Sequence, residues 1–129
     1  MMLIIIGLAG SGKTTYFNQY LSKDYEVFDD FISNFFDGEV MGKINENICL
    51  IDPRLCDFEM FKKIMNEIEK FVDKSKIKLL LFENNPHRCL INTQTRKKKN
   101  VAKMIEIYSK KYDLKNYEDY TYEIIKVYE

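Results

Sequence analysis

The chain has 129 residues, of which 46% are hydrophobic, so it is long and apolar enough to fold around a core of its own. Lysine plus arginine and aspartate plus glutamate number 20 each, which gives a formal net charge of zero. No overall field therefore attracts the chain to nucleic acid or to a membrane surface, and we expect any anionic partner to be recognised locally.

Strand-like and helical segments alternate along the chain. Five short apolar segments read as strands, at residues 1–6, 25–28, 48–51, 78–82 and 121–128. Helical spacing of apolar residues marks segments 13–22, 58–72 (with Asp57 as N-cap), 88–99 and 101–112. This alternation predicts an α/β fold with a five-stranded parallel sheet, in a single domain over residues 1–129.

The first apolar run leads directly into GLAGSGKT at residues 7–14, which satisfies the pattern G-x-x-x-x-G-K-[ST]. Glycines allow backbone N–H groups to turn inward onto an anion, and the following helix presents its positive end to the same anion. We expect Lys13 to reach the β- and γ-phosphates and the Thr14 hydroxyl to ligate Mg²⁺. The predicted binding site for Mg-ATP comprises Gly7, Ala9, Gly10, Ser11, Gly12, Lys13, Thr14 and Thr15.

Acidic residues stand where the expected strands end, at the sheet edge where ligands bind in open parallel sheets. Asp52 follows four apolar residues and is the candidate metal ligand, although Asp-Pro is also an ordinary turn. Asp29 and Asp30 are the candidates for a general base that takes a proton from a hydroxyl group. Either of them could instead cap a helix, and Glu83 is the weakest candidate of the set.

Arginine is scarce, with three residues against 17 lysines, so its positions are informative. Arg54 follows Asp52, whereas Arg88 and Arg96 follow the fourth expected strand. Arginine bridges charge on a transferred phosphoryl group well, so the run that begins at Arg96 is interpreted as part of a lid over residues 85–100. The alternative is a solvated basic face.

The three cysteines are odd in number and form no C-x-x-C pair, which favours neither a disulfide framework nor a zinc site. The first apolar run lacks a basic leader and is interrupted by the glycine-rich motif, so it does not read as a signal peptide. No apolar run is long enough for a membrane span. We therefore expect a cytoplasmic protein with no membrane partner.

The order of motifs resembles that of small P-loop kinases typified by the bacteriophage polynucleotide 5′-hydroxyl kinase, a group that also contains zeta-toxin-like sugar kinases. The resemblance runs through GLAGSGKTTY, VFDDF, CLIDPRL, LLFENNP and TRKKKNVAKMIEIYSKKY. It implies a P-loop NTPase-type three-layer sandwich with a short helical lid. It also implies that Lys13 and Thr14 hold phosphate and Mg²⁺, that Asp29 activates the acceptor, that Asp52 assists the metal or substrate, and that Arg96 is the lid arginine.

These features predict an ATP-dependent phosphotransferase whose acceptor is a hydroxyl group of a nucleoside, a polynucleotide 5′-end or a small metabolite. The candidate catalytic residues are Lys13, Asp29 and Arg96, and the candidate metal ligands are Thr14 and Asp52. Two alternatives remain: a nucleoside monophosphate kinase, and a non-catalytic ATP-binding module. A GTPase is disfavoured because the sequence holds no N-K-x-D motif.

Overall fold

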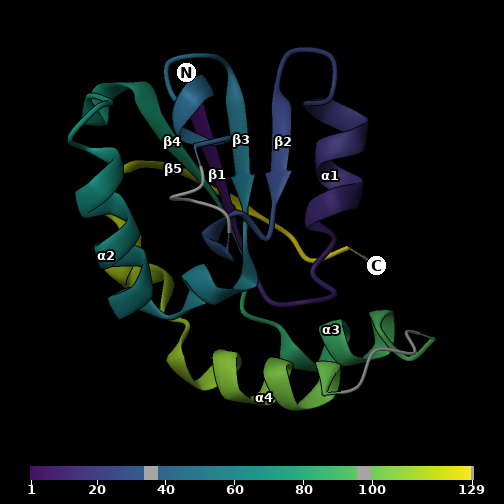
Figure 1. Cartoon of the computed structure of the whole chain (residues 1–129). Helices are drawn as coiled ribbons and strands as arrows, with labels where there is room; N and C mark the ends of the chain where they lie inside the picture. The colour runs from purple at the N-terminus through teal and green to yellow at the C-terminus, as the bar shows by residue number, and fades with distance from the viewer. Residues whose placement is uncertain (34–37, 96–99, 129) are drawn as a thin grey trace.

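The computed structural model describes residues 1–33, 38–95 and 100–128. Five strands form one parallel sheet in the order β2-β3-β1-β4-β5 (Figure 1). The strands are β1 (Met2–Ile6), β2 (Glu26–Asp29), β3 (Ile48–Ile51), β4 (Ile77–Phe82) and β5 (Thr121–Ile125). The predicted α/β fold with a five-stranded parallel sheet is confirmed.

Helices flank this sheet on both faces, an arrangement compatible with a three-layer sandwich. The α-helices are α1 (Lys13–Tyr20), α2 (Phe58–Ile68), α3 (Pro86–Asn92) and α4 (Val101–Lys111). Short 3₁₀ helices are η2 (Met41–Lys43), η3 (Pro53–Cys56), η4 (Lys74–Lys76) and η5 (Leu114–Tyr117). In Figure 1, α1 covers one face and α2 the other, while α3 and α4 lie beyond the carboxyl ends of the strands. No helix in the described ranges is long and apolar enough to cross a membrane.

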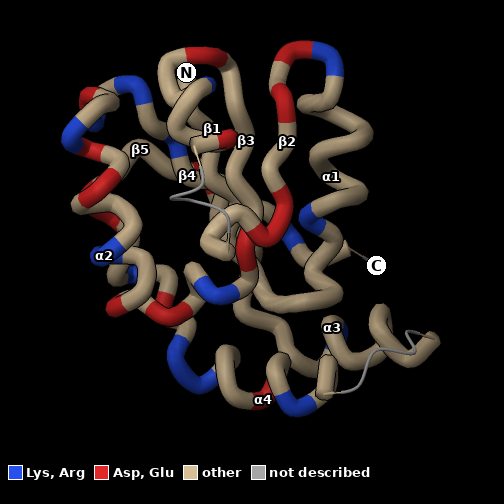
Figure 2. The backbone as a smooth tube through the Cα atoms, in the orientation of Figure 1, with Lys and Arg blue, Asp and Glu red and all other residues tan. Residues whose placement is uncertain are grey.

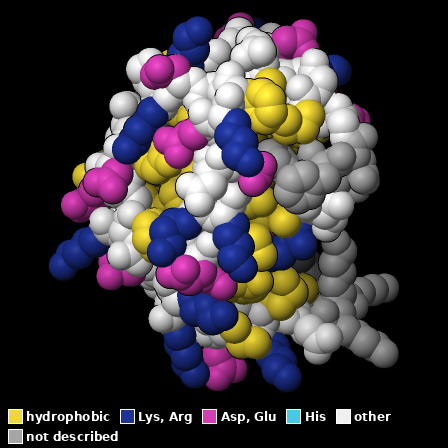
Figure 3. All heavy atoms as spheres, turned by 60° about the vertical axis from the view of Figure 1, so that its left-hand side comes forward, with side chains coloured by type: hydrophobic (Ala, Val, Ile, Leu, Met, Phe, Trp, Pro, Cys, Tyr) yellow, Lys and Arg dark blue, Asp and Glu magenta, His cyan; other side chains and the backbone are white. Residues whose placement is uncertain are grey.

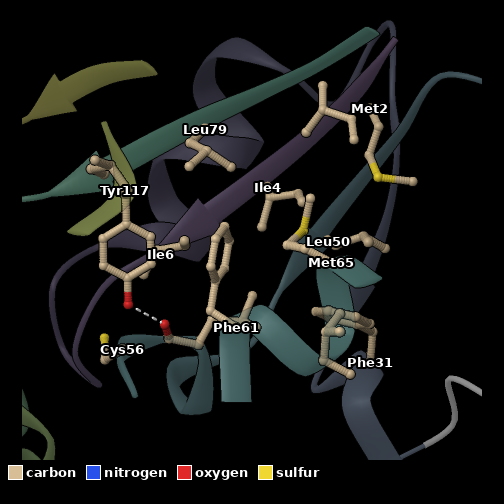
Figure 4. Packing of buried hydrophobic residues seen from close by; sticks show 14 of the residues in the cluster. Met2, Ile4, Ile6, Phe31, Leu50, Cys56, Phe61, Met65, Leu79 and Tyr117 are labelled. Atoms are coloured by element: carbon tan, nitrogen blue, oxygen red, sulfur yellow. Dashed lines mark hydrogen bonds between the residues drawn. The ribbon is translucent and has the colours of Figure 1, made fainter. Parts of the chain in front are cut away.

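The three central strands are almost completely buried because helices cover both of their faces, whereas the side chains of β2 and β5 at the sheet edges are mostly exposed. The larger part of the core lies between the sheet and α2, where Ile4, Leu50 and Leu79 pack with Phe61 (Figure 4). Full burial of each such side chain stabilises the fold by about 1.5–3 kcal/mol. The core therefore fixes the central strands from which the site loops leave.

Two buried tyrosines tie the last third of the chain to the ends of β1 and β4 and to η3. The Tyr112 hydroxyl donates to the carbonyl of Phe82 at 2.6 Å and lies 3.3 Å from that of Ile6. The Tyr117 hydroxyl donates to the carbonyl of Leu55 (Figure 4). Burial raises the pKa of both hydroxyl groups far above the ordinary tyrosine value, so both remain donors at physiological pH.

The outer surface carries charges of both signs, in keeping with the zero net charge. On the face turned forward in Figure 3, lysines and arginines alternate with acidic residues and hydrophobic side chains. Along α2 and just beyond its end, Lys62 pairs with Glu59 and Lys70 pairs with Glu67, each at 3.1 Å. No single sign of charge dominates this face.

The expected boundaries differ from the structure mainly at the C-terminal ends: the helix expected over 58–72 ends at Ile68, the helix expected over 88–99 is Pro86–Asn92, and the last strand is also shorter than expected. It ends at Ile125 instead of 128, because the backbone N–H groups that follow have partners outside the sheet. Val127 N donates to Oε1 of Glu83 at 3.2 Å, and Tyr128 N donates to the carbonyl of Ser11 at 2.9 Å. The chain therefore leaves β5 and passes against the loop that follows β1.

Candidate functional site

The loop that joins β1 to α1, residues 7–12, is called the glycine loop below. Two of its glycines have positive φ values, 83° at Gly10 and 100° at Gly12. A Cβ atom at Gly10 would lie 2.6 Å from the carbonyl oxygen of Cys89, and one at Gly12 would lie 2.5 Å from Cβ of Tyr128. Only glycine therefore meets both the conformation and the space at these positions.

Lys13 begins α1 and turns its side chain back to the glycine loop. Its Nζ donates to the carbonyls of Gly7 at 2.9 Å and Leu8 at 2.7 Å, and the residue is only 9% exposed. No side-chain hydrogen bond caps the N-terminus of α1 within the described part of the chain. A cation and the positive end of a helix thus stand together at one end of the loop, which favours an anion there.

Other parts of the chain hold the carbonyl groups of the glycine loop. Nδ2 of Asn92, the last residue of α3, donates to the carbonyls of Gly10 at 3.0 Å and of Tyr128 at 2.7 Å. Tyr128 N in turn donates to the carbonyl of Ser11. These bonds fix the conformation of the loop, whose Ser11 N–H donates within the loop to the carbonyl of Leu8 at 3.1 Å; a loop of this kind can turn other backbone N–H groups onto an anion.

A cavity of about 300 Å³ opens beside the glycine loop. It lies at the carboxyl ends of β2 and β3, beside the loop that follows β1, and ligands of open parallel sheets usually bind at this end of the strands. Its lining comes from the loop, the start of α1, the ends of β2 and β3, and α4. The lining residues are Ala9, Gly10, Gly12, Lys13, Thr14, Thr15, Asp29, Asp30, Ile51, Pro53, Val101 and Met104.

The cavity brings together most of the residues that the sequence assigned to the site. Gly7 and Ser11 belong to the same loop but do not line the cavity, and Ser11 is fully buried. Asp52 is also absent from the lining. The predicted lid arginine, Arg96, lies outside the described residues, as do the three lysines that follow it.

Asp29 is the last residue of β2 and stands exposed at the rim of the cavity. Partial desolvation raises the pKa of its carboxyl group, and the charges of Asp30 and Asp52 raise it further. The backbone N–H of Asp30, 3.0 Å from Oδ1, and the charge of Lys13 act in the opposite direction. A carboxylate with a raised pKa is a better proton acceptor, as a general base requires.

Asp52 is completely buried at the end of β3 and is bonded to the chain through both oxygens. Its Oδ1 accepts from the backbone N and from Nε of Arg54, each at 2.9 Å. Its Oδ2 accepts from Nη2 of Arg54 at 2.7 Å and from the backbone N of Ile32 at 3.2 Å. Nη2 also donates to Oγ of Ser33 at 3.0 Å.

We call this arrangement the Asp52–Arg54 clamp. It joins the end of β3 to the segment that follows Asp29 and Asp30, so it positions the rim of the cavity. The role of Asp52 as a metal ligand stays a prediction. Among the residues described, no group of three His, Cys, Asp or Glu side chains could hold a metal ion, so a metal here needs ligand oxygens from elsewhere.

Sequence reasoning missed three contributions to the site. Arg54 was noted only for its scarcity, although its spacing of two residues from Asp52 is compatible with a local ion pair. Asn92 carries no local signal, because its partners are remote in sequence. Met104 was expected only on an apolar helix face, yet it lines the cavity. Glu83, the weakest of the acidic candidates from the sequence, accepts a hydrogen bond from the backbone N–H of Val127.

Comparison with known proteins gives a relative without a described activity. No protein-family model matches the chain. An uncharacterized protein of Acanthamoeba polyphaga mimivirus is 38% identical over 133 residues, an alignment that covers 98% of this chain and 96% of the viral protein. The chain therefore belongs to the same family as this mimivirus protein.

Proposed function

We propose that the protein is an ATP-dependent phosphotransferase and that its glycine loop is a P-loop, which holds the phosphates of Mg-ATP. The observation that carries this proposal is the shared cavity. The glycine loop with Lys13 and the raised-pKa carboxylate of Asp29 open onto the same space of about 300 Å³. A phosphate donor and a hydroxyl acceptor placed there would meet between a cation and a base.

The donor side fits a triphosphate because Lys13 and the positive end of α1 lie together beside the cavity, while Gly10 and Gly12 allow the loop its positive-φ turns. Lys13 would exchange its bonds to the loop carbonyls for bonds to phosphate oxygens. Thr14, exposed in the first turn of α1, would ligate Mg²⁺, which neutralises charge on the β- and γ-phosphates when bound. Asp52 would assist the metal only by exchanging one of its bonds to Arg54.

On the acceptor side, Asp29 would receive the proton of a hydroxyl group. The acceptor oxygen forms a bond to the γ-phosphorus, the bond from that phosphorus to the bridging oxygen of ADP breaks, and the hydroxyl proton passes to Asp29. Lys13 would stabilise negative charge on the transferred phosphoryl group, and Arg96 is predicted to do the same. A nucleoside monophosphate kinase would share the donor side and differ in its acceptor.

The test is transfer of labelled γ-phosphate from ATP to a panel of nucleosides, nucleotides, 5′-hydroxyl oligonucleotides and sugars. Asp29→Asn is expected to lower transfer by about 10²–10⁴-fold while leaving Mg-ATP affinity within a few fold. Asp30→Asn is the matched control and is expected to retain far more activity. If the wild type binds ATP but transfers phosphate to no acceptor, the protein is a nucleotide-binding module and the proposal fails.

A further inference from the structure

We propose that the acceptor is a small, uncharged hydroxyl compound with an apolar or aromatic face and no phosphate group of its own, the class that nucleosides represent. This inference rests on the proposed function and concerns the half of the cavity that faces the glycine loop. That half is formed by the ends of β2 and β3, by Pro53 and by α4.

Among the described residues, negative charge is concentrated on this side of the cavity, although the chain as a whole is neutral. Figure 2 shows acidic positions where β2 and β3 end, and the two strands are neighbours in the sheet. Asp29 and Asp30 both line the cavity, and Asp52 lies behind them. The charges of Asp30 and Asp52 raise the pKa of Asp29, whereas the charge of Lys13, at the glycine loop, lowers it.

A phosphate group on the acceptor would enter this negative region and be repelled. Arg54 neutralises Asp52 by bonding to both of its oxygens, so the excess negative charge among the described residues on this side is that of Asp29 and Asp30. A neutral hydroxyl compound meets no such penalty, and its hydroxyl group can donate to the carboxylate of Asp29.

The rest of this side is an apolar wall made by Ile51, Pro53, Val101 and Met104. Met104 is 37% exposed, so part of its side chain is free to contact a ligand. A flexible thioether and aliphatic side chains accommodate the face of a planar ring well. The combination of one carboxylate for the hydroxyl and one apolar wall for the body of the molecule matches a nucleoside.

The experiment compares acceptors that share a free 5′-hydroxyl group. With saturating Mg-ATP, kcat/KM is measured for the four common deoxynucleosides and for their 3′-monophosphates, with the 5′-monophosphates and glucose as further acceptors. Nucleosides are expected to exceed their 3′-monophosphates by about tenfold or more, because two carboxylates oppose the added phosphate. Asp30→Asn is expected to lower the ratio of kcat/KM for a nucleoside to kcat/KM for its 3′-monophosphate, since it removes one of the two negative charges that repel the phosphate.

Met104→Gln tests the apolar wall, and Ile107→Gln is its control because Ile107 lies on the same helix, is 42% exposed and does not line the cavity. Met104→Gln should raise KM for the nucleoside about three- to tenfold and leave KM for ATP unchanged, as one apolar contact predicts. Preference for a phosphorylated acceptor or for glucose, or equal effects of the two variants, would overturn the inference and leave the phosphotransferase intact. Transfer to no acceptor would overturn both.

Discussion

The Asp52–Arg54 clamp makes the most quantitative prediction about this fold. Asp52 is fully buried, and the guanidinium of Arg54 supplies hydrogen bonds of 2.9 and 2.7 Å to its two oxygens. Arg54→Met removes these bonds but keeps an aliphatic stem of similar length. The buried carboxylate would then retain only the backbone N–H groups of Ile32 and of residue 54.

Breaking a buried ion pair from one side costs about 3–5 kcal/mol, because an uncompensated charge remains inside. We take the lower end, about 3 kcal/mol, since the side chain of Arg54 is 32% exposed and water can partly replace it. For a chain of this size, such a loss corresponds to a fall in Tm of about 10 °C. Asp52→Asn with Arg54→Met leaves no buried charge and should recover most of the loss.

The assay is chemical denaturation of the wild type, the two single variants and the double variant, which together give the coupling energy of the pair. We expect coupling of at least about 1 kcal/mol, as for contacting charged groups. Additive effects would refute the clamp. The same variants separate the two roles of Asp52: if it also ligates Mg²⁺, Asp52→Asn raises the Mg²⁺ concentration needed for half-maximal ATP binding, and Arg54→Met does not.

Three further predictions concern the glycine loop and the rim of the cavity. Gly12→Ala should destabilise the fold by more than about 1–2 kcal/mol, because it adds a left-handed residue and a contact with Tyr128, and it should weaken Mg-ATP binding. Asn92→Ala removes the bond to the carbonyl of Gly10 and should weaken Mg-ATP binding by about 5- to 30-fold, the equivalent of one or two hydrogen bonds. Asp29→Asn should raise Tm at pH 7 but not at pH 3, as measured by thermal unfolding.

The sign of the last effect follows from the raised pKa of Asp29. The folded protein keeps this proton to a higher pH than the unfolded chain does, so wild-type stability falls as the pH rises from about 4, where the unfolded carboxyl group titrates. Asparagine at position 29 carries no charge, so the variant does not lose stability as the pH rises. A lower Tm for Asp29→Asn than for the wild type at pH 7 would contradict the assigned pKa direction.

Two matched controls address the loop variants. Gly42 has no heavy atom within 4 Å of an added Cβ, so Gly42→Ala should leave stability and ATP binding nearly unchanged. Asn84 donates to the carbonyls of Ser109 and Tyr112, two backbone groups like those that Asn92 holds. Asn84→Ala should lower Tm without changing ATP affinity. Equal loss of ATP affinity in Asn84→Ala and Asn92→Ala would show that Asn92 acts through stability alone.

Local patterns were sufficient to predict the central part of the fold. The segment 48–51 was predicted as a strand and is one in the structure, because a short apolar run that ends at an Asp-Pro turn is typical of a buried strand. Asp57 caps α2 as expected, with Oδ1 accepting from Glu59 N at 3.1 Å. The last strand was predicted too long because the alternation of apolar residues continues past Ile125. The backbone N–H groups after Ile125 instead bond to Glu83 and Ser11, which are remote in sequence and give no local signal.

The candidate site divides in the same way. The glycine loop and Asp29 are recognisable because their residue types and spacing are local properties of the chain. Asn92 and Met104 reach the site only when α3 and α4 fold across the strand ends (Figure 1), so no pattern around either residue predicts its contact. For Asp52, the sequence allowed both a metal ligand and a turn residue, and the structure adds the clamp as a third use of its carboxylate.

The most direct test of the phosphotransferase mechanism is single-turnover transfer of labelled γ-phosphate to a nucleoside, measured beside Mg-ATP binding, in the wild type and in Asp29→Asn. We predict product formation by the wild type and a loss of about 10²–10⁴-fold in the variant, with the Kd for Mg-ATP changed by no more than a few fold. Wild-type levels of transfer by Asp29→Asn would contradict the assignment of this carboxylate as the base.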